Sequence, residues 1–248
     1  ATVYLPLAST GFRPPTILTV GPAGQFATIQ AALDAAGIGN GTRTSADERG
    51  YLRDPSRAFL RSNEGATTPS AFIRARPRPV SSAEQVPEAY EIRVARGTYR
   101  ENLVVPAVGS VRLQGGWSTD YTARSGDSAL TVIDGGARGA VLTMEVSDGA
   151  QHALQIEGFT IRNGLAAAPW HGGGIHVALW NAGTRLALDL TNNTIADNHA
   201  SDRGGGLFME AEQGAALEAR LTGNTFADNT AGNEGGGLRV ASRSGAAT

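Results

Sequence analysis

The fold is decided by a repeated stretch that reads LALDLTNNTIADNHASDRGGGLFMEAE over residues 186–212. A close copy, LEARLTGNTFADNTAGNEGGGLRVA, follows over residues 217–241, and a looser copy, running from LQIEGFTIRNG to HGGGIHVAL, precedes it over residues 154–179. Each copy contains a glycine triplet, and the triplets begin at Gly172, Gly204 and Gly235. The offsets are 204 − 172 = 32 and 235 − 204 = 31 residues, and self-similarity at such a period marks a repeat architecture.

The last two copies align in three short apolar clusters. Their matched positions are Leu186, Leu188 and Leu190 with Leu217, Ala219 and Leu221, then Thr194 and Ile195 with Thr225 and Phe226, then Leu207 and Met209 with Leu238 and Val240. Alternation with period two predicts strands with one buried face, and the Asn and Gly residues between clusters predict turns. We therefore predict three strands per repeat, each pairing in parallel with the same strand of the next repeat.

Polar residues recur at fixed places in this pattern. The matched pairs are Asn193 with Asn224, Asn198 with Asn229, and Asp197 with Asp228. We expect the amides to hydrogen-bond along the stack, which satisfies polar groups that are costly to bury. The aspartates, roughly 5 Å apart at one strand spacing, are interpreted as repeated turn residues. We expect no cofactor, with a calcium ion at this pair as the alternative.

Two other repeat folds fit less well. A leucine-rich repeat is shorter than this period, and no helical pattern fills the second half of each copy. A calcium-binding nonapeptide roll needs an Asp after its glycines, whereas here the triplets are followed by Ile175, Leu207 and Leu238. The glycines also lack a following Lys or helix, which excludes a phosphate-binding loop.

The region before the repeats begins with a strand and a helix. Residues 16–20 (TILTV) predict the first strand, and residues 26–36 (FATIQAALDAA) predict a helix with Thr28 as its N-terminal cap and Gly37 as its stop. We expect this helix to cover the open end of the strand stack. Strands continue from Tyr90.

The domain organisation follows from these patterns. We predict an extended arm at 1–15 and one β-domain at 16–248, made of the strand and helix at 16–36, an insertion at 37–87 and the repeats at 88–248. The insertion is rich in Arg, Pro and Ser, with a short helix expected near 56–61 and a strand near 71–74. The arm carries the apolar residues Val3, Tyr4, Leu5 and Leu7. It is expected to lie on its own domain or to pair with another molecule.

Composition narrows the functional class. The chain has 33 Gly, no Cys and a formal charge of −2, so it lacks the basic footprint of a nucleic-acid-binding protein and any disulfide framework. No apolar run reaches the roughly 18 residues of a transmembrane helix. The first residues resemble neither a signal peptide nor its hydrophobic core, which we interpret as the start of a mature, processed chain or of a trimmed one.

The segments GTYRENLVV, LTVIDGG, FTIRNG and NNTIADNHA with its following GGGL resemble right-handed parallel β-helix proteins of the pectin-lyase-like superfamily. More narrowly, they resemble secreted bacterial proteins with polymorphic-outer-membrane-protein-type repeats. The resemblance implies an all-β solenoid with an N-terminal capping helix, and a structural role for Glu101 of GTYREN. Enzymes of this superfamily use clustered carboxylates, often calcium, and an Arg or Lys base on acidic polysaccharides. Their catalytic motifs are not recognisable in this chain.

Two irregular segments are the candidate ligand-binding sites. The first holds Trp117, Asp120, Tyr121 and Arg124, a mixture suited to stacking on a sugar and clamping its hydroxyls, or to a loop-closing ion pair under a packed Trp. The second, residues 165–171, is two residues longer than its counterpart and holds Trp170 and His171. Insertions that break a repeat often carry the binding site, although a Trp packed over the neighbouring turn is the alternative.

The last copy ends the pattern at Leu238 and Val240, with no helix after it to cover the strand edge. Either the natural chain continues past Thr248, or this open edge pairs with another chain. We therefore expect a non-enzymatic, secreted or cell-surface structural or adhesive protein of a bacterium, assembling with itself or with other surface proteins into a fibre or lattice. The alternative is a β-helix enzyme or binding protein for polysaccharides, with a glycan as its partner.

Overall fold

A computed structural model describes residues 14–39, 89–168 and 171–243. These residues form parallel β-sheets with one α-helix, α1 (Ile29–Gly39), and a short 3₁₀ turn at Ser128–Leu130. The predicted arm residues Val3, Tyr4, Leu5 and Leu7, most of the predicted insertion, and Trp170 lie outside the described residues. The domain boundaries and the elements expected near 56–61 and 71–74 therefore stay predictions.

The strands form four sheets, named A to D. Sheet A contains β1 (Thr16–Val20), β2 (Ala89–Ala95), β5 (Ser110–Trp117), β8 (Gln151–Glu157), β12 (Arg185–Thr191) and β16 (Ala216–Thr222). Sheet B contains β3 (Gly97–Tyr99), β6 (Thr131–Asp134), β9 (Thr160–Arg162), β13 (Thr194–Ala196) and β17 (Thr225–Ala227). Sheet C contains β4 (Leu103–Val104), β7 (Leu142–Val146), β11 (Ile175–Leu179), β15 (Leu207–Glu212) and β19 (Leu238–Arg243). Sheet D contains β10 (Leu165–Ala166), β14 (His199–Ala200) and β18 (Thr230–Ala231).

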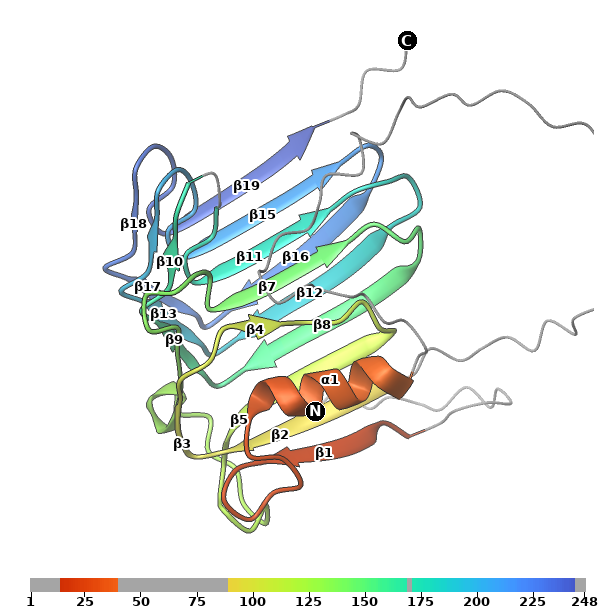
Figure 1. Cartoon of the computed structure of the whole chain (residues 1–248), viewed down its shortest axis with the longest axis vertical. Coiled ribbons are helices and arrows are strands. Elements are labelled where there is room, and N and C mark those ends of the chain that lie inside the picture. Colours follow the sequence, from red (N-terminus) through yellow and green to blue (C-terminus); the bar gives the residue numbers. More distant parts are fainter. Residues whose placement is uncertain (1–13, 40–88, 169–170, 244–248) are drawn as a thin grey trace, which may run out of the picture. The chain divides into compact units, whose positions relative to one another are not determined.

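The chain visits the sheets in a fixed cycle. From β8 onward it passes through sheets A, B, D and C three times in succession, and each pass begins one strand further along sheet A (Figure 1). Every pairing between these strands is parallel. This topology is compatible with a β-helix. The prediction of three strands per repeat was wrong, because each repeat has a fourth strand of two residues that lacks an apolar run, such as His199–Ala200. This strand lies between the sheet B and sheet C strands in the chain and pairs within sheet D.

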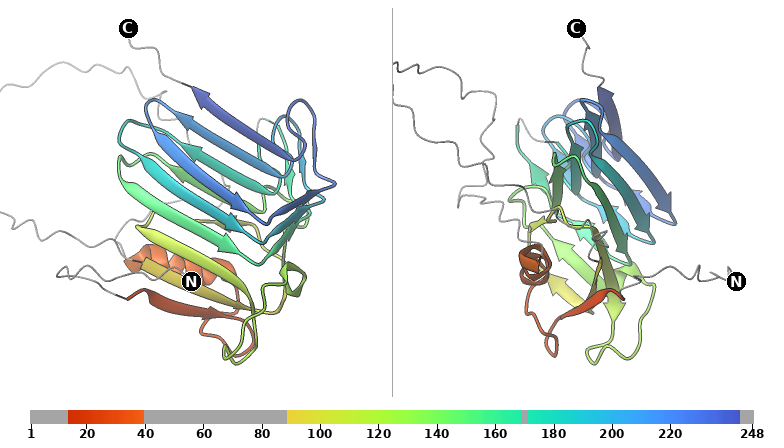
Figure 2. Two further views of the ribbon diagram at one scale, coloured as in Figure 1. Left: turned by 180° about the vertical axis from the view of Figure 1, so that it is seen from behind. Right: turned by 90° about the vertical axis from the view of Figure 1, so that its right-hand side faces the viewer.

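The register between successive turns matches the repeat. Leu188 pairs with Leu154 on one side and Ala219 on the other, and Ile195 lies between Ile161 and Phe226. Figure 2 shows the resulting stack, with strand colours changing in chain order from red to blue. Equivalent positions therefore form continuous rows of side chains, and the apolar rows face inward as the alternation predicts.

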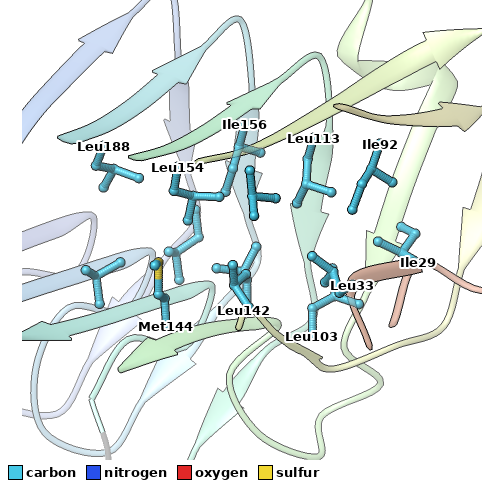
Figure 3. Close-up of a cluster of buried hydrophobic side chains, with 14 of the residues drawn as sticks. Ile29, Leu33, Ile92, Leu103, Leu113, Leu142, Met144, Leu154, Ile156 and Leu188 are labelled. Atoms are coloured by element: carbon cyan, nitrogen blue, oxygen red, sulfur yellow. The ribbon is translucent and has the colours of Figure 1, made fainter. Parts of the chain in front are cut away.

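The core lies between the inner faces of sheets A and C. Figure 3 shows Ile92, Leu113 and Leu154 of sheet A opposite Leu103 and Leu142 of sheet C. All five side chains are almost completely buried. Each sheet alone has one apolar face, so only this face-to-face arrangement removes both faces from water.

Helix α1 covers the N-terminal end of this core and packs against β1, β2 and β4. Its buried face includes Ile29 and Leu33, which point into the same cluster (Figure 3). Thr28 Oγ1 accepts a hydrogen bond from Ala31 N, as expected for the cap. The predicted C-terminal end was wrong, because the helix continues through Gly37 to Gly39.

The N-terminal amides of α1 also have a partner from the distant segment GTYREN. The two carboxylate oxygens of Glu101 accept hydrogen bonds from Ile29 N at 3.0 Å and from Gln30 N at 2.9 Å. A carboxylate at this position satisfies two free helix amides and complements the helix dipole. Glu101 thus attaches the helix to the first turn of the stack.

The glycine triplets form a tight corner before sheet C. The first glycine of each triplet has a positive φ, between 65° and 70°. The middle glycines Gly173 and Gly205 lie so close to the next turn that a Cβ on Gly205 would overlap the carbonyl oxygens of Thr230 and Gly236. Glycine is needed at both places, first for its backbone conformation and then for the close approach of successive turns.

Candidate functional site

The last described turn, β16 to β19, leaves one side of four sheets open. Each of these strands ends its sheet and pairs with one neighbour only among the described residues. Leu221, Leu238 and Val240 are 37%, 39% and 53% exposed, whereas the matching Leu207 and Met209 of the previous turn are buried. The inner apolar rows therefore continue to the surface here, next to unpaired strand groups.

The edge of β16 is charged on its outer side. Glu218 and Arg220 are exposed and alternate with Leu217, Ala219 and Leu221, whose side chains continue the inward rows. Aligning this copy of the repeat with the previous one predicted no role for Glu218 and Arg220. The two copies nevertheless differ at these outer positions, where the previous copy has Ala187 and Asp189.

Both predicted asparagine pairs hydrogen-bond between turns. Asn224 Oδ1 accepts from Asn193 N at 3.0 Å and from Asn193 Nδ2 at 3.1 Å. Asn229 Oδ1 accepts from Asn198 N at 3.1 Å and from Asn198 Nδ2 at 3.0 Å. Asn193 and Asn198 are each 1% exposed, so these bonds satisfy amides inside the stack.

Asp197 and Asp228 occupy matching turns next to the asparagines. Their φ values are 55° and 50°, in the left-handed region that Asp and Asn tolerate better than most residues. Asp197 also lines a shallow pocket of about 310 Å³ with Asn163 and His199. Within the described ranges, no group of three His, Cys, Asp or Glu side chains could hold a metal ion. The calcium alternative at this pair therefore gains no third His, Cys, Asp or Glu ligand there.

The segment after Trp117 is a loop fixed to sheet A by Arg124. Arg124 Nε donates to Gly115 O at 2.9 Å, and its guanidinium lies 3.0 Å from Glu157 Oε1. Partial burial raises the pKa of Glu157, but hydrogen bonding and charge from Arg124 and Arg112 outweigh it and hold that pKa below its ordinary value. Arg124 thus holds the loop against sheet A, and its guanidinium already has partners in Gly115 and Glu157.

Trp117 and Asp120 also have partners within the protein. The guanidinium of Arg93 lies 4.5 Å from the centre of the Trp117 ring, a cation–π contact. Asp120 accepts hydrogen bonds from Ser118 Oγ and Thr122 Oγ1, which lower its pKa and form a local turn. Of the four predicted ligand contacts in this loop, these two and Arg124 are engaged in holding the loop together.

Tyr121 reaches away from the loop toward the turn between β1 and α1. A Cβ on Gly24 would lie 2.5 Å from Tyr121 Oη, so the ring packs directly over this glycine. Tyr121 Oη and Trp117 Nε1 are buried and have no hydrogen-bond partner within the described parts of the chain. Two buried donors near one corner are unusual, because most buried polar groups are paired.

The same corner contains an open pocket of about 580 Å³. It is lined by Gly21, Pro22, Gly24, Gln25, Ala27, Arg96, Gly97, Thr98 and Tyr99. Burial, followed by the neighbouring Tyr121 and Glu101, raises the pKa of Tyr99 to about 12. Tyr99 Oη donates to Ala95 O at 2.9 Å. No carboxylate is among the lining residues, so the corner suits binding better than acid–base chemistry.

The second predicted segment is less irregular than its length suggested. Leu165 and Ala166 form β10 and pair with His199 and Ala200, so they continue the repeat. The ring of His171 lies 4.5 Å from that of Phe208, on the outer side of sheet C. Trp170 lies outside the described residues, so its predicted ligand contact stays a prediction.

Phe208 belongs to an outer cluster that the sequence did not indicate. His176 stacks on Phe208 at 5.5 Å between ring centres, and its Nε2 lies 3.5 Å from Glu145 Oε1. His176 Nδ1 is 3.0 Å from His171 O. Glu145, His176 and Phe208 lie in the neighbouring strands β7, β11 and β15 of sheet C, so their proximity comes from the register between turns.

Comparisons with known proteins give no assignment: no family model, no curated protein and no solved structure matches the chain. No helix in the described part of the chain is long and apolar enough to span a membrane.

Proposed function

We propose that the chain is a non-enzymatic structural or adhesive protein, secreted or displayed on a cell surface, that associates through the last turn of its stack. We also propose that its parallel sheets form a right-handed β-helix of the pectin-lyase-like superfamily with polymorphic-outer-membrane-protein-type repeats. The fixed cycle of parallel strands and the 31–32-residue period support this fold.

The exposed apolar side chains of the last described turn support the functional proposal. Leu221 occupies the place that Leu190 has one turn earlier, where the side chain is fully buried. Leu238 and Val240 likewise continue the rows of Leu207 and Met209. A further layer of β-structure on this end would bury the three exposed side chains and pair the open strand groups.

The test is to measure molar mass by size-exclusion chromatography with light scattering, on the full chain and on a chain lacking residues 1–9. We expect the full chain to exceed its monomer mass of 25.6 kDa. A lower mass for the shortened chain would assign a part of the contact to the arm. Monomeric masses for both, with no filaments in electron micrographs, would overturn the proposal.

The alternative, glycan binding, is favoured by one observation. The pocket at the corner of β1 and β3 combines Tyr99, Arg96, Gln25 and Thr98 with a glycine-rich wall, and Tyr121 lies beside it. Aromatic rings with a few polar groups are typical of small-ligand sites. A glycan array and a reducing-end release assay distinguish binding from cleavage, and loss of array signal in Tyr99→Ala would locate the site.

A further inference from the structure

The pocket at the corner of β1 and β3 is bordered by three separate segments of the chain. Residues of the turn at 21–27 and residues 96–99 line it, and the ring of Tyr121, from the loop after β5, packs over Gly24 in its wall. Figures 1 and 2 show the turn after β1 and the loop after β5 side by side at this end of the stack. Side chains from three places in the sequence can therefore reach one ligand.

The charge of the pocket comes from Arg96, an exposed side chain that lines it. Arg96 Nε lies 3.5 Å from Gly116 O, which is a long contact for a hydrogen bond. Among the described residues no carboxylate forms an ion pair with Arg96, whereas Arg93 and Arg124 in the same region each have a glutamate partner. The pocket therefore presents a guanidinium whose charge has no local counter-ion.

The other polar side chains of the pocket add hydrogen-bond donors. Gln25 Oε1 accepts from Thr19 N at 3.2 Å, which orients the amide so that its Nε2 is a donor, and Thr98 contributes a hydroxyl. Burial raises the pKa of Tyr99 to about 12, so its hydroxyl keeps its proton at neutral pH. The carboxylate of Glu101, which also influences Tyr99, is bound to the first two amides of α1. A pocket with donors, one cation and no carboxylate in its lining is complementary to anionic oxygen atoms.

Tyr121 is held beside this pocket in an unfavourable state. Its φ is 58°, which is unusual for a bulky residue, and its Oη is buried without a hydrogen-bond partner in the described part of the chain. Backbone strain and unpaired buried polar groups each cost free energy, and both are found at ligand sites. Because Gly24 has no Cβ to obstruct the ring, a small rotation would bring the hydroxyl to the pocket, where a ligand oxygen could accept its hydrogen bond.

We propose that this corner binds a tetrahedral oxyanion, the phosphate or sulfate group of a small molecule. Arg96 supplies the opposite charge, and charge-assisted hydrogen bonds are the stronger kind. Gln25, Thr98 and Tyr121 donate to the remaining oxygens. These donors come from three separate segments, which suits tetrahedrally arranged oxygens better than the two coplanar oxygens of a carboxylate. The inference deepens the glycan alternative for the same pocket, because it names the anionic group that the ligand carries, and it does not depend on the proposed association.

The test is isothermal titration calorimetry of the full chain with inorganic phosphate, sulfate, glucose 6-phosphate, glucuronate and glucose. We expect the phosphate and sulfate ligands to bind, glucuronate to bind more weakly and glucose not to bind. Glucose and glucose 6-phosphate share one ring, so the difference between them measures the phosphate group alone. Tighter binding of glucose 6-phosphate than of inorganic phosphate supports a phosphate ester as the ligand, and the reverse order supports a free anion.

Three variants locate the site. Arg96→Gln removes the charge and is expected to weaken phosphate binding by about 10- to 100-fold. Tyr121→Phe removes only the hydroxyl and is expected to weaken it by about 3- to 10-fold, while the melting temperature without ligand stays the same or rises, because a buried unpaired donor is lost. Arg138→Gln changes an exposed arginine outside the pocket and is the matched control, with phosphate binding expected to be unchanged.

The possible results separate this site from the other proposals. Equal affinity for glucose and glucose 6-phosphate would keep the glycan alternative and overturn the oxyanion site, and a preference for glucuronate over both phosphates would overturn it too. The same holds if no phosphate or sulfate ligand binds at millimolar concentration, or if Arg96→Gln binds phosphate as well as the unaltered chain does. Light scattering on the same samples reports separately on association, so a monomer that binds phosphate keeps this inference and overturns the proposed self-association.

Discussion

Asn224 Oδ1 accepts hydrogen bonds from both the backbone and the side-chain nitrogen of Asn193, one turn earlier in the stack. Asn193 repeats this arrangement, because its Oδ1 accepts from Phe159 N at 3.0 Å. The amide of Asn193 also donates to Ile156 O at 2.8 Å. One side chain therefore connects its own turn to both neighbouring turns, which makes the asparagine rows a structural part of the fold.

We expect Asn193→Ala to lower the free energy of unfolding by about 2–4 kcal/mol, because it leaves Phe159 N and Ile156 O without their buried partner. Urea denaturation followed by circular dichroism measures this change. Asn233→Ala is the control: this exposed amide bonds Asp202, and its loss is expected to cost less than about 1 kcal/mol. Equal losses in the two variants would contradict the role of the buried row.

Gly205→Ala is expected to destabilise the protein by about 3 kcal/mol or more, or to prevent folding. The added methyl group would overlap the carbonyl oxygens of Thr230 and Gly236 in the next turn, and backbone cannot move away cheaply. Gly126→Ala is the matched control, because no atom lies within 4 Å of its Cβ position. We expect the control to change the melting temperature little. A similar tolerance at Gly205 would mean that the turns are less closely packed there.

Protonation of Glu157 should make the free energy of unfolding depend on pH in the acidic range. Its folded-state pKa is held below the unfolded value by Arg124 and Arg112 despite partial burial, so its stabilisation is complete above the unfolded pKa, about 4.3. It is lost as the pH falls through the folded-state pKa. We expect Glu157→Gln to cost about 1 kcal/mol at pH 7 and progressively less in acid, measured by urea denaturation from pH 3 to 7.

Asp127→Asn provides the control for that pH series. Asp127 caps the 3₁₀ turn by accepting from Ala129 N at 2.9 Å, a role that Asn performs equally well. Its stability profile should follow that of the unaltered protein. A constant deficit of Glu157→Gln at every pH would indicate lost packing and exclude the charge explanation.

Ionisation of Tyr99 should make the free energy of unfolding depend on pH in the alkaline range. Its folded-state pKa of about 12 exceeds the ordinary tyrosine value of 10.0, so its stabilisation is complete below pH 10 and is lost as the pH rises toward 12. The loss is about 1–2 kcal/mol after allowance for the solvent that screens this half-buried ring. Absorbance titration at about 295 nm should show one late-ionising tyrosine that disappears in Tyr99→Phe. Its persistence in that variant would assign the shift to another tyrosine.

Much of the fold could be predicted from the sequence, because the repeat recurs at a nearly constant spacing with the same residue types. The glycine triplets at Gly172, Gly204 and Gly235 fixed the period, and the positive φ at each is the conformation that glycine permits. Thr28 as a helix cap was also predictable, since the capping rule is local. The short strand at His199 and Ala200 was missed, because two residues have no measurable alternation.

The candidate sites were less predictable. Trp117, Asp120 and Arg124 were grouped by their closeness in sequence, but Arg124 turns to Gly115 and Glu157, and Arg93 from another strand covers Trp117. Proximity in the sequence shows which residues share a loop, but it does not show which residues their side chains contact. The corner of Tyr99 and Tyr121 required the loop to pack over Gly24, a contact between segments almost one hundred residues apart.

The sequence by itself determined the period, the inward rows and the asparagine pairs of this protein, because each depends on spacing along one chain. The tertiary structure decided which side of each strand is free. Glu218 and Arg220 become edge residues only because β16 pairs with β12 on one side, and Glu101 becomes a helix cap only because α1 folds over the first turn. Such relations depend on contacts between distant segments, and these form only when the sheets stack and bury their shared core.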